Sequence, residues 1–132
     1  MSTAPRLDVI VIGAGQAGPF LAAKLVAQGQ RVALIEARDL GGTCVNRGCT
    51  PTKTLRKSAR VAYMARRAGE FGVQLGTVKV DFAAAMQRMQ DRVDEARSGL
   101  EGWLGSLQGL RIIKGHGRLA GRDGDDFLVK VG

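Results

Sequence analysis

The stretch of sequence that decides the fold is LDVIVIGAGQAG, at residues 7–18. Its first half, residues 7–12, is a short run of aliphatic and β-branched side chains, which is typical of a buried strand in a parallel sheet. Its second half has the pattern G-x-G-x-x-G and leads into a segment where Ala17, Leu21 and Leu25 recur at helical spacing. A second apolar run covers residues 31–36. Strand, helix and strand within about thirty residues predict a right-handed βαβ unit in an α/β fold.

The three glycines of the pattern are those that a dinucleotide-binding turn requires. Gly13 allows the tight turn, Gly15 lets the backbone approach a pyrophosphate, and Gly18 lets the helix pack on the strand. The helix N-terminus offers free N–H groups to the negative charge. Glu36 ends the second strand, where its carboxylate can accept from both hydroxyls of an adenosine ribose and would repel a 2′-phosphate. The pattern therefore predicts FAD or NAD rather than NADP at this loop.

Residues 41–48 are expected to form a glycine-rich loop. Cys44 lies within this loop, and Cys49 directly follows it. Such a pair beside a βαβ unit indicates redox or metal chemistry. Zinc needs about four ligands, and His116 is the only histidine, so we predict no metal site. Gly48 gives the freedom needed to bring the two Cα atoms within the ~4.4–6.8 Å of a disulfide. We therefore predict a redox-active disulfide.

A helix is expected to begin near Thr50 and Pro51 and to run to about residue 67. Cys49 then lies at its N-terminus, with Lys53 one turn later. Both features lower the pKa of a cysteine thiol below the reference value of about 8.5, so we expect Cys49 to be the more acidic thiol. Cys44 is expected to be the more exposed member of the pair.

A second long helix is expected to begin after Asp81, which is a good N-terminal cap. Its apolar residues alternate by three and four and form one predicted core face: Phe82, Met86, Met89, Val93, Ala96, Leu100, Trp103 and Leu107. The simplest partner for this face is the preceding helix, in an antiparallel hairpin. Residues 111–131 are predicted to be β-strands, with a break at residues 115–117 and a turn at residues 123–124.

Composition limits the classes of protein that fit. The 132 residues have room for one domain, and 45% hydrophobic with 24% charged residues are typical of a globular chain. No apolar run is long enough for a membrane span, and no secretory signal is visible, so we expect a cytoplasmic protein without membrane contact. The net charge of +8 suits an anionic ligand. Aromatic residues make up only 5%, too few for a stacking surface, so no nucleic acid is expected.

Residues 41–53, GGTCVNRGCTPTK, resemble the active-site signature of the class I pyridine nucleotide-disulfide oxidoreductases. This family includes dihydrolipoamide dehydrogenase, glutathione reductase and mercuric reductase. Together with the glycine loop, Glu36 and the Gly-His-Gly segment at residues 115–117, the resemblance spans nearly the whole chain. The Val45-Asn46 pairing and residues 111–119 favour mercuric-reductase-like members. The resemblance implies a Rossmann-like FAD-binding domain with a parallel sheet, a helical hairpin and a β-meander.

The resemblance also implies roles for individual residues. FAD has its pyrophosphate at Gly13, Gly15 and Gly18 and its adenosine ribose on Glu36. Other parts of the cofactor are approached by four further residues: Gly42 and Thr43 at the ribityl-pyrophosphate stretch, Lys53 near flavin N5, and Gly117 at the adenine edge.

For the two cysteines, the resemblance implies separate functions. Cys49 faces the flavin as the charge-transfer thiolate, and Cys44 is the outer thiol that attacks the substrate. Electrons pass from NAD(P)H through FAD to the disulfide, and then to a disulfide or mercuric ion. His116 is not the acid–base catalyst of this scheme.

Finally, the resemblance implies parts that residues 1–132 do not include. These are the NAD(P)-binding domain, the dimerisation domain that donates a His and Glu pair across a homodimer, and later strands of the FAD domain. We therefore expect residues 1–132 to be the N-terminal part of the FAD-binding domain, incomplete at its C-terminus and inactive alone. Two alternatives remain open: a stand-alone flavin or nucleotide-binding module with a redox-sensing thiol pair, and a basic nucleic-acid-binding domain.

Overall fold

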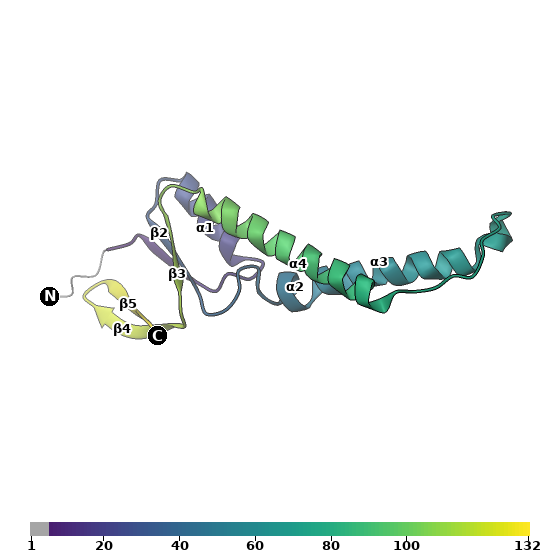
Figure 1. Cartoon of the computed structure of the whole chain (residues 1–132). Helices are drawn as coiled ribbons and strands as arrows, with labels where there is room; N and C mark the ends of the chain where they lie inside the picture. The colour runs from purple at the N-terminus through teal and green to yellow at the C-terminus, as the bar shows by residue number, and fades with distance from the viewer. Residues whose placement is uncertain (1–5) are drawn as a thin grey trace.

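Three short parallel strands form a sheet at one end of the molecule (Figure 1). They are β1 (Val9–Ile12), β2 (Val32–Glu36) and β3 (Leu110–Lys114). The computed structural model describes residues 6–132, and in it β2 lies between the other two strands. The first four residues of β2 are fully buried, as the near-continuous apolar run predicts for a central parallel strand. The predicted α/β fold with its βαβ unit is confirmed.

Helix α1 (Gly18–Ala27) connects β1 to β2 and packs on the sheet through small residues. Its buried residues are Gly18, Pro19 and Ala22, whereas Leu21 is 49% exposed. Of the apolar residues that recur at helical spacing, Leu25 packs partly against the core, whereas Leu21 does not. The close approach of helix and sheet places the smallest side chains at the fully buried positions.

An ion pair joins the beginnings of β1 and β2. The backbone N–H of Arg31 donates to Asp8 at 2.8 Å, and its guanidinium makes bonds of 3.0 and 2.8 Å to the same carboxylate. These hydrogen bonds hold the pKa of the Asp8 carboxyl far below its ordinary value. The two strands are therefore fixed at both ends, here by a bidentate pair and at the other end by the glycine loop.

Two helices follow β2 where the sequence predicted a loop and then a helix. Helix α2 (Gly42–Arg47) occupies most of the expected glycine-rich loop, because its glycines lie only at the two ends of that segment. Helix α3 (Cys49–Arg66) begins two residues before Pro51 rather than at it. A proline is tolerated throughout the first turn, where the backbone N–H groups have no partner within the helix.

Helix α3 and helix α4 (Phe82–Gly105) form the predicted antiparallel hairpin, which extends away from the sheet as a long arm (Figure 1). A short 3-10 helix, η1 (Ala68–Phe71), follows α3 at the far end of this arm. Asp81 caps α4 as predicted, because its carboxylate accepts from the N–H of Ala84 at 2.9 Å. In the described part of the chain, no helix has both the length and the apolar character to cross a membrane.

The buried face of α4 differs in part from the predicted stripe. Val93 is 3% exposed and lies on that face, as predicted, but Phe82 is 69% and Trp103 is 37% exposed. Leu104, next to Trp103, is 1% exposed instead. The start of α4 has only α3 to pack against, so Phe82 stays exposed, whereas Val93 is covered farther along the helix. Where α4 passes the sheet, Leu104 enters the core with five other buried residues: Ala14, Ala22, Val32, Leu34 and Leu40.

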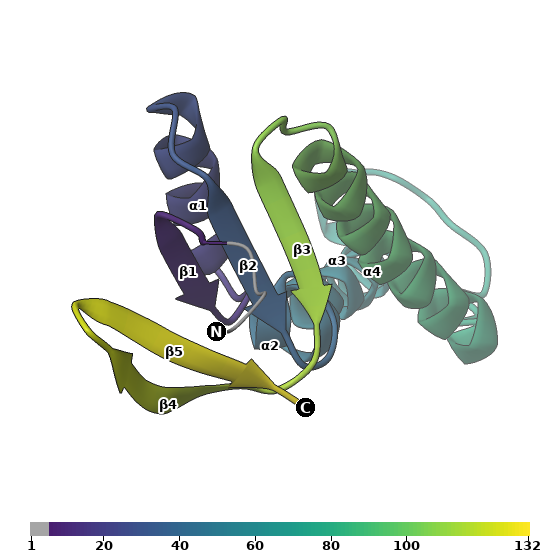
Figure 2. The ribbon, with the colours of Figure 1, turned by 90° about the vertical axis from the view of Figure 1, so that its left-hand side faces the viewer.

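The last two strands form a separate antiparallel hairpin, β4 (Gly117–Asp123) with β5 (Asp126–Val131). The predicted turn is confirmed, since Gly124 lies there with a positive φ of 62°. The expected three-stranded meander does not occur in the described residues, because β3 pairs with β2 in the parallel sheet. Figure 2 shows the hairpin lying across the ends toward which the three parallel strands point.

Replacing Gly18 with alanine tests the contact that holds α1 on the sheet. A Cβ there would stand 2.0 Å from the carbonyl oxygen of Gly13, so we expect Gly18→Ala to lower the free energy of unfolding by at least about 2 kcal/mol. The control is Gly99→Ala in α4, where a Cβ meets no atom within 4 Å. That change should stabilise the chain by about 0.5–1 kcal/mol. Urea unfolding measures both, and equal midpoints for Gly18→Ala and the wild type would contradict this packing.

Candidate functional site: a glycine loop beside a cysteine pair

The carboxyl ends of the three parallel strands meet at one edge of the sheet, where α/β proteins bind ligands. Backbone hydrogen bonds hold the segments that follow these strands together at this edge. The N–H of Gly13 donates to the Ile35 carbonyl at 2.7 Å, and the N–H of Gly115 donates to the Glu36 carbonyl at 2.9 Å. Gly117 lies over the same edge, since a Cβ on it would come 3.2 Å from Ile12 and 3.1 Å from Ile35. The predicted positions 13–18, 36 and 117 are therefore brought together.

The glycine loop has the shape and the electrostatics of an anion site. Gly13 has a φ of 101°, which favours glycine, and ideal Cβ atoms at Gly13 and Gly15 would meet no described atom within 4 Å. The space over the loop is therefore open to a ligand. In the described residues, no side chain caps the N-terminus of α1 and no acidic residue lies in its first turn. Uncapped N–H groups and the helix dipole both favour a diphosphate here.

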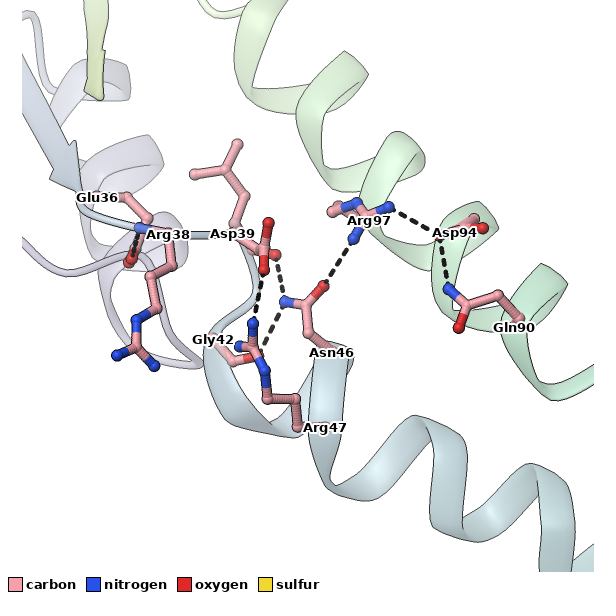
Figure 3. Close-up of polar contacts among 10 residues, drawn as sticks. Glu36, Arg38, Asp39, Gly42, Asn46, Arg47, Gln90, Asp94 and Arg97 are labelled. Carbon is pink, nitrogen blue, oxygen red and sulfur yellow. Dashed lines mark hydrogen bonds and ion pairs between the residues drawn. The ribbon is translucent and has the colours of Figure 1, made fainter. Parts of the chain in front are cut away.

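Glu36 braces this loop through its carboxylate. One oxygen accepts from the N–H of Ala14 at 2.7 Å. The other accepts from the N–H of Arg38 at 2.8 Å (Figure 3). A carboxylate has about four acceptor positions, so two remain for ribose hydroxyls. A cavity of about 220 Å³ adjoins Glu36 and is lined also by Arg38, Ile112 and Lys114. The residues present therefore fit the adenosine and diphosphate parts of a dinucleotide.

The two cysteines form a disulfide between α2 and α3, with their Cα atoms 4.6 Å apart. This confirms the predicted pairing. Gly48, between the two helices, makes the close approach possible, since a Cβ on it would stand 3.1 Å from the carbonyl oxygen of Thr43. Cys49 is the first residue of α3, whose N-terminus has no side-chain cap and no acidic residue in its first turn. Lys53 lies exposed one turn later. This environment favours a Cys49 thiolate once the disulfide is reduced.

The relative exposure of the two cysteines differs from the prediction. Cys49 is exposed and Cys44 is half-buried, whereas the sequence prediction made Cys44 the more exposed member. The cause is the unpredicted helix α2. Cys44 lies within that helix and is partly covered, but Cys49 stands at a free helix N-terminus. Thr43, the neighbouring predicted site residue, is exposed.

The segment that leads into the cysteine pair packs directly on the glycine loop. The N–H of Gly41 donates to the Ala14 carbonyl at 2.7 Å, and the side-chain amide of Gln16 donates to the Gly41 carbonyl at 3.2 Å. A Cβ on Gly42 would stand 2.8 Å from the Cα of Gly15, and the φ of Gly42 is 59°. Gly42 is thus required by a backbone-to-backbone contact. The glycine loop and the segment that carries the cysteine pair therefore form one continuous site.

Asn46, between the two cysteines in sequence, holds α2 in place. Its side-chain amide donates to the carbonyls of Leu40 at 3.0 Å and Gly42 at 2.9 Å. Its carbonyl oxygen accepts from Arg97 of α4 at 3.4 Å, and Arg97 is itself held by Asp94 at 2.7 Å (Figure 3). Neither the structural role of Asn46 nor the contact with Arg97 was predicted from the sequence. The signal for Asn46 was its position four residues after Gly42; nothing local indicates Arg97, because that contact spans 51 residues.

Other candidate sites are absent or remote in the described residues. Among residues 6–132, no group of three or more histidine, cysteine or acidic side chains is arranged to hold a metal ion. A hollow of about 380 Å³ lies at the far end of the hairpin arm, lined by residues of α3, η1 and the following loop, such as Ala65, Gly69 and Leu75. It is away from the cysteine pair, which stands at the opposite end of α3.

The fold and this site together define a class of protein, and comparisons with known proteins agree. Residues 7–131 match the family described as pyridine nucleotide-disulphide oxidoreductase. The chain belongs to this family, which confirms the resemblance of residues 41–53.

Particular relatives are similar over most of this chain. Dihydrolipoyl dehydrogenase of Chlamydia muridarum (strain MoPn / Nigg) is 39% identical over 112 residues, which are 85% of this chain and 24% of that protein. Mercuric reductase of Shigella flexneri is 37% identical over 128 residues, 95% of this chain and 22% of that protein. A solved structure, the Cu(II) complex of the HOCl-induced flavoprotein disulfide reductase RclA from Escherichia coli, matches with a TM-score of 0.69 and 31% identity. It covers 94% of this chain and 24% of that one.

The chain therefore spans about a quarter of the length of the relatives that it matches. Dihydrolipoyl dehydrogenases and a mercuric reductase match at similar identity, so the narrower preference for mercuric-reductase-like members stays a prediction.

Replacing Asn46 with alanine tests the contacts that hold α2. The change leaves the carbonyls of Leu40 and Gly42 without these donors, so we expect a loss of about 1–3 kcal/mol in the free energy of unfolding. The loss should be larger in the reduced chain, where no disulfide ties α2 to α3. The control is Gln87→Ala, which removes a single exposed hydrogen bond from the Gln87 side-chain amide to Asp91 on α4. Urea unfolding of oxidised and reduced protein decides it; losses no larger than in the control would refute the assigned role.

Proposed function

We propose that this chain binds FAD at residues 13–18 and carries the redox disulfide of a flavoprotein disulfide reductase. In the whole enzyme, electrons pass from NAD(P)H through FAD to Cys44 and Cys49, and then to a disulfide or Hg(II) substrate. The observation that supports this most strongly is the contact of Gly42 with Gly15, because it places the cysteine helix directly against the dinucleotide loop. A dinucleotide held by the loop then extends past the residues that precede Cys44.

Each cofactor-contacting residue has a physical task in this proposal. Gly13, Gly15 and Gly18 let backbone N–H groups of the loop and of α1 hold the diphosphate. Glu36 uses its remaining acceptor positions for the ribose hydroxyls, and the backbone at Gly117 meets the adenine edge. FAD supplies a two-electron carrier that accepts hydride from a nicotinamide.

The two cysteines divide the remaining work. The N-terminus of α3 and Lys53 stabilise Cys49 as a thiolate facing the flavin, with Lys53 near N5. Cys44, held half-buried in α2, attacks the substrate. We further propose that the whole enzyme is a cytoplasmic homodimer, with the nicotinamide site and an acid–base His and Glu pair outside these 132 residues.

Flavin titration tests the role of Glu36. Glu36→Gln keeps the size of the side chain but replaces the carboxylate with an amide. The amide has one neutral acceptor oxygen, which cannot serve both the loop N–H groups and the ribose hydroxyls. We expect the affinity for FAD to fall about tenfold or more, as the loss of one charged hydrogen bond of ~1.5–3 kcal/mol implies. Glu95→Gln, on α4, is the control and should titrate as the wild type does. Fluorescence titration gives both values, and an unchanged Kd for Glu36→Gln would count against the assignment.

Alkylation of the reduced chain tests the position of the flavin. Without FAD, brief iodoacetamide treatment should label Cys49 first, because it is the exposed cysteine and stands at a helix N-terminus. Saturating FAD should slow labelling of Cys49 severalfold and leave Cys44 nearly unchanged, as mapped by mass spectrometry. Protection of Cys44 instead would reverse the proposed roles of the two thiols.

A further inference from the structure

Helix α3 carries a row of positive charges on the face that bears Cys49. An α-helix turns by about 100° per residue, so Arg56, Lys57 and Arg60 all lie within about 80° of the direction of Cys49. All three are exposed. We call these three residues the basic stripe; Lys53, which precedes them on the same face, is assigned to the flavin. With a rise of about 1.5 Å per residue, the stripe begins about 10 Å from Cys49 and ends about 17 Å from it.

The surroundings of the basic stripe do not neutralise it. Helix α3 contains no acidic residue in its 18 positions, and no ion pair among the described residues involves Arg56, Lys57 or Arg60. Helix α4 packs on the other side of α3, where Arg88 donates to the Thr54 carbonyl at 3.2 Å and to the Ser58 hydroxyl at 3.4 Å, so α4 does not cover the stripe. The exposed face of α3 that continues from Cys49 is therefore positively charged.

This arrangement is costly for the helix itself. Arg56 and Arg60 are like charges at i and i+4, which destabilise a helix by a few tenths of a kcal/mol. Local rules are broken in this way chiefly where a binding partner offsets the cost. An anion bound along the stripe would do so.

We propose that the substrate reduced at Cys44 is a small, extended disulfide whose carboxylate or phosphate groups bind along the basic stripe. This inference deepens the proposed function and depends on it, since it concerns the substrate of the same cysteine pair. The stripe selects anionic disulfides over neutral and cationic ones by raising their local concentration and holding their charged ends.

The chemistry that the stripe serves is thiol–disulfide exchange. The Cys44 thiolate attacks one sulfur of the substrate R–S–S–R, so a Cys44–S–S–R bond forms and one R–S⁻ leaves. The Cys49 thiolate then attacks the Cys44 sulfur, which re-forms the protein disulfide and releases the second R–S⁻. The substrate gains two electrons, the dithiol loses two, and each departing thiolate takes a proton from water.

The test uses the 132-residue chain, reduced with dithiothreitol and desalted, and needs no flavin. Three probes share one thiol: oxidised glutathione, which is dianionic, the disulfide of its monoethyl ester, which is neutral, and that of its diethyl ester, which is dicationic. The stripe variant is Arg56→Gln, Lys57→Gln and Arg60→Gln. The control variant is Lys24→Gln, Arg111→Gln and Lys130→Gln, which loses the same charge at exposed positions on α1, β3 and β5. Rates of thiol loss are compared with the wild type for each probe.

At an ionic strength of about 10 mM, where charges act over ~30 Å, the stripe variant should react with the dianion at least about threefold more slowly than the wild type. Its rate with the neutral probe should be unchanged, its rate with the dication should rise, and about 1 M salt should remove these differences. The control variant should show effects less than half as large. Equal effects in the two variants, or no dependence on probe charge, overturn the inference. Failure of the wild type to react even with the neutral probe overturns the proposed function instead.

Discussion

The backbone contact between Gly42 and Gly15 is the constraint on which the rest of the site depends. A single Cβ at position 42 would stand 2.8 Å from the Gly15 Cα, and the hydrogen bond from Gly41 to Ala14 holds the same two segments together at 2.7 Å. Because both segments are backbone, this geometry leaves no adjustable side chain between them. The position of the disulfide therefore follows from that of the glycine loop, which in turn is fixed by the ends of β1 and β2.

The parts of the structure that the sequence predicted are those set by local rules. The βαβ unit follows from apolar runs and from glycines whose roles are local in the chain, such as Gly13 with its φ of 101°. The disulfide pairing and the cap at Asp81 likewise depend on residues close in sequence. The strand positions were correct to within two residues for β1 and one for β2, because both end at sharp turns.

The parts that the sequence did not predict depend on partners distant in the chain. Helix α2 was expected to be a loop, because a six-residue helix between glycines is marginal by itself. Asn46 and Arg97 stabilise it, and that contact crosses 51 residues. The burial of Leu104 in place of Trp103 depends on where α4 passes the sheet, and the pairing of β3 depends on the long crossover through α2, α3 and α4. These choices are made by packing rather than by local preference.

The central claim is that a flavin held at the glycine loop lies against Cys49 and not against Cys44. A thiolate in contact with oxidised flavin produces a long-wavelength charge-transfer absorption, so the decisive measurement is the visible spectrum of two single-cysteine variants at saturating FAD. We predict that Cys44→Ser shows this band at neutral to alkaline pH and loses it on acidification, whereas Cys49→Ser shows none. A band in Cys49→Ser but not in Cys44→Ser, or in neither variant although titration shows FAD bound to both, would contradict the account.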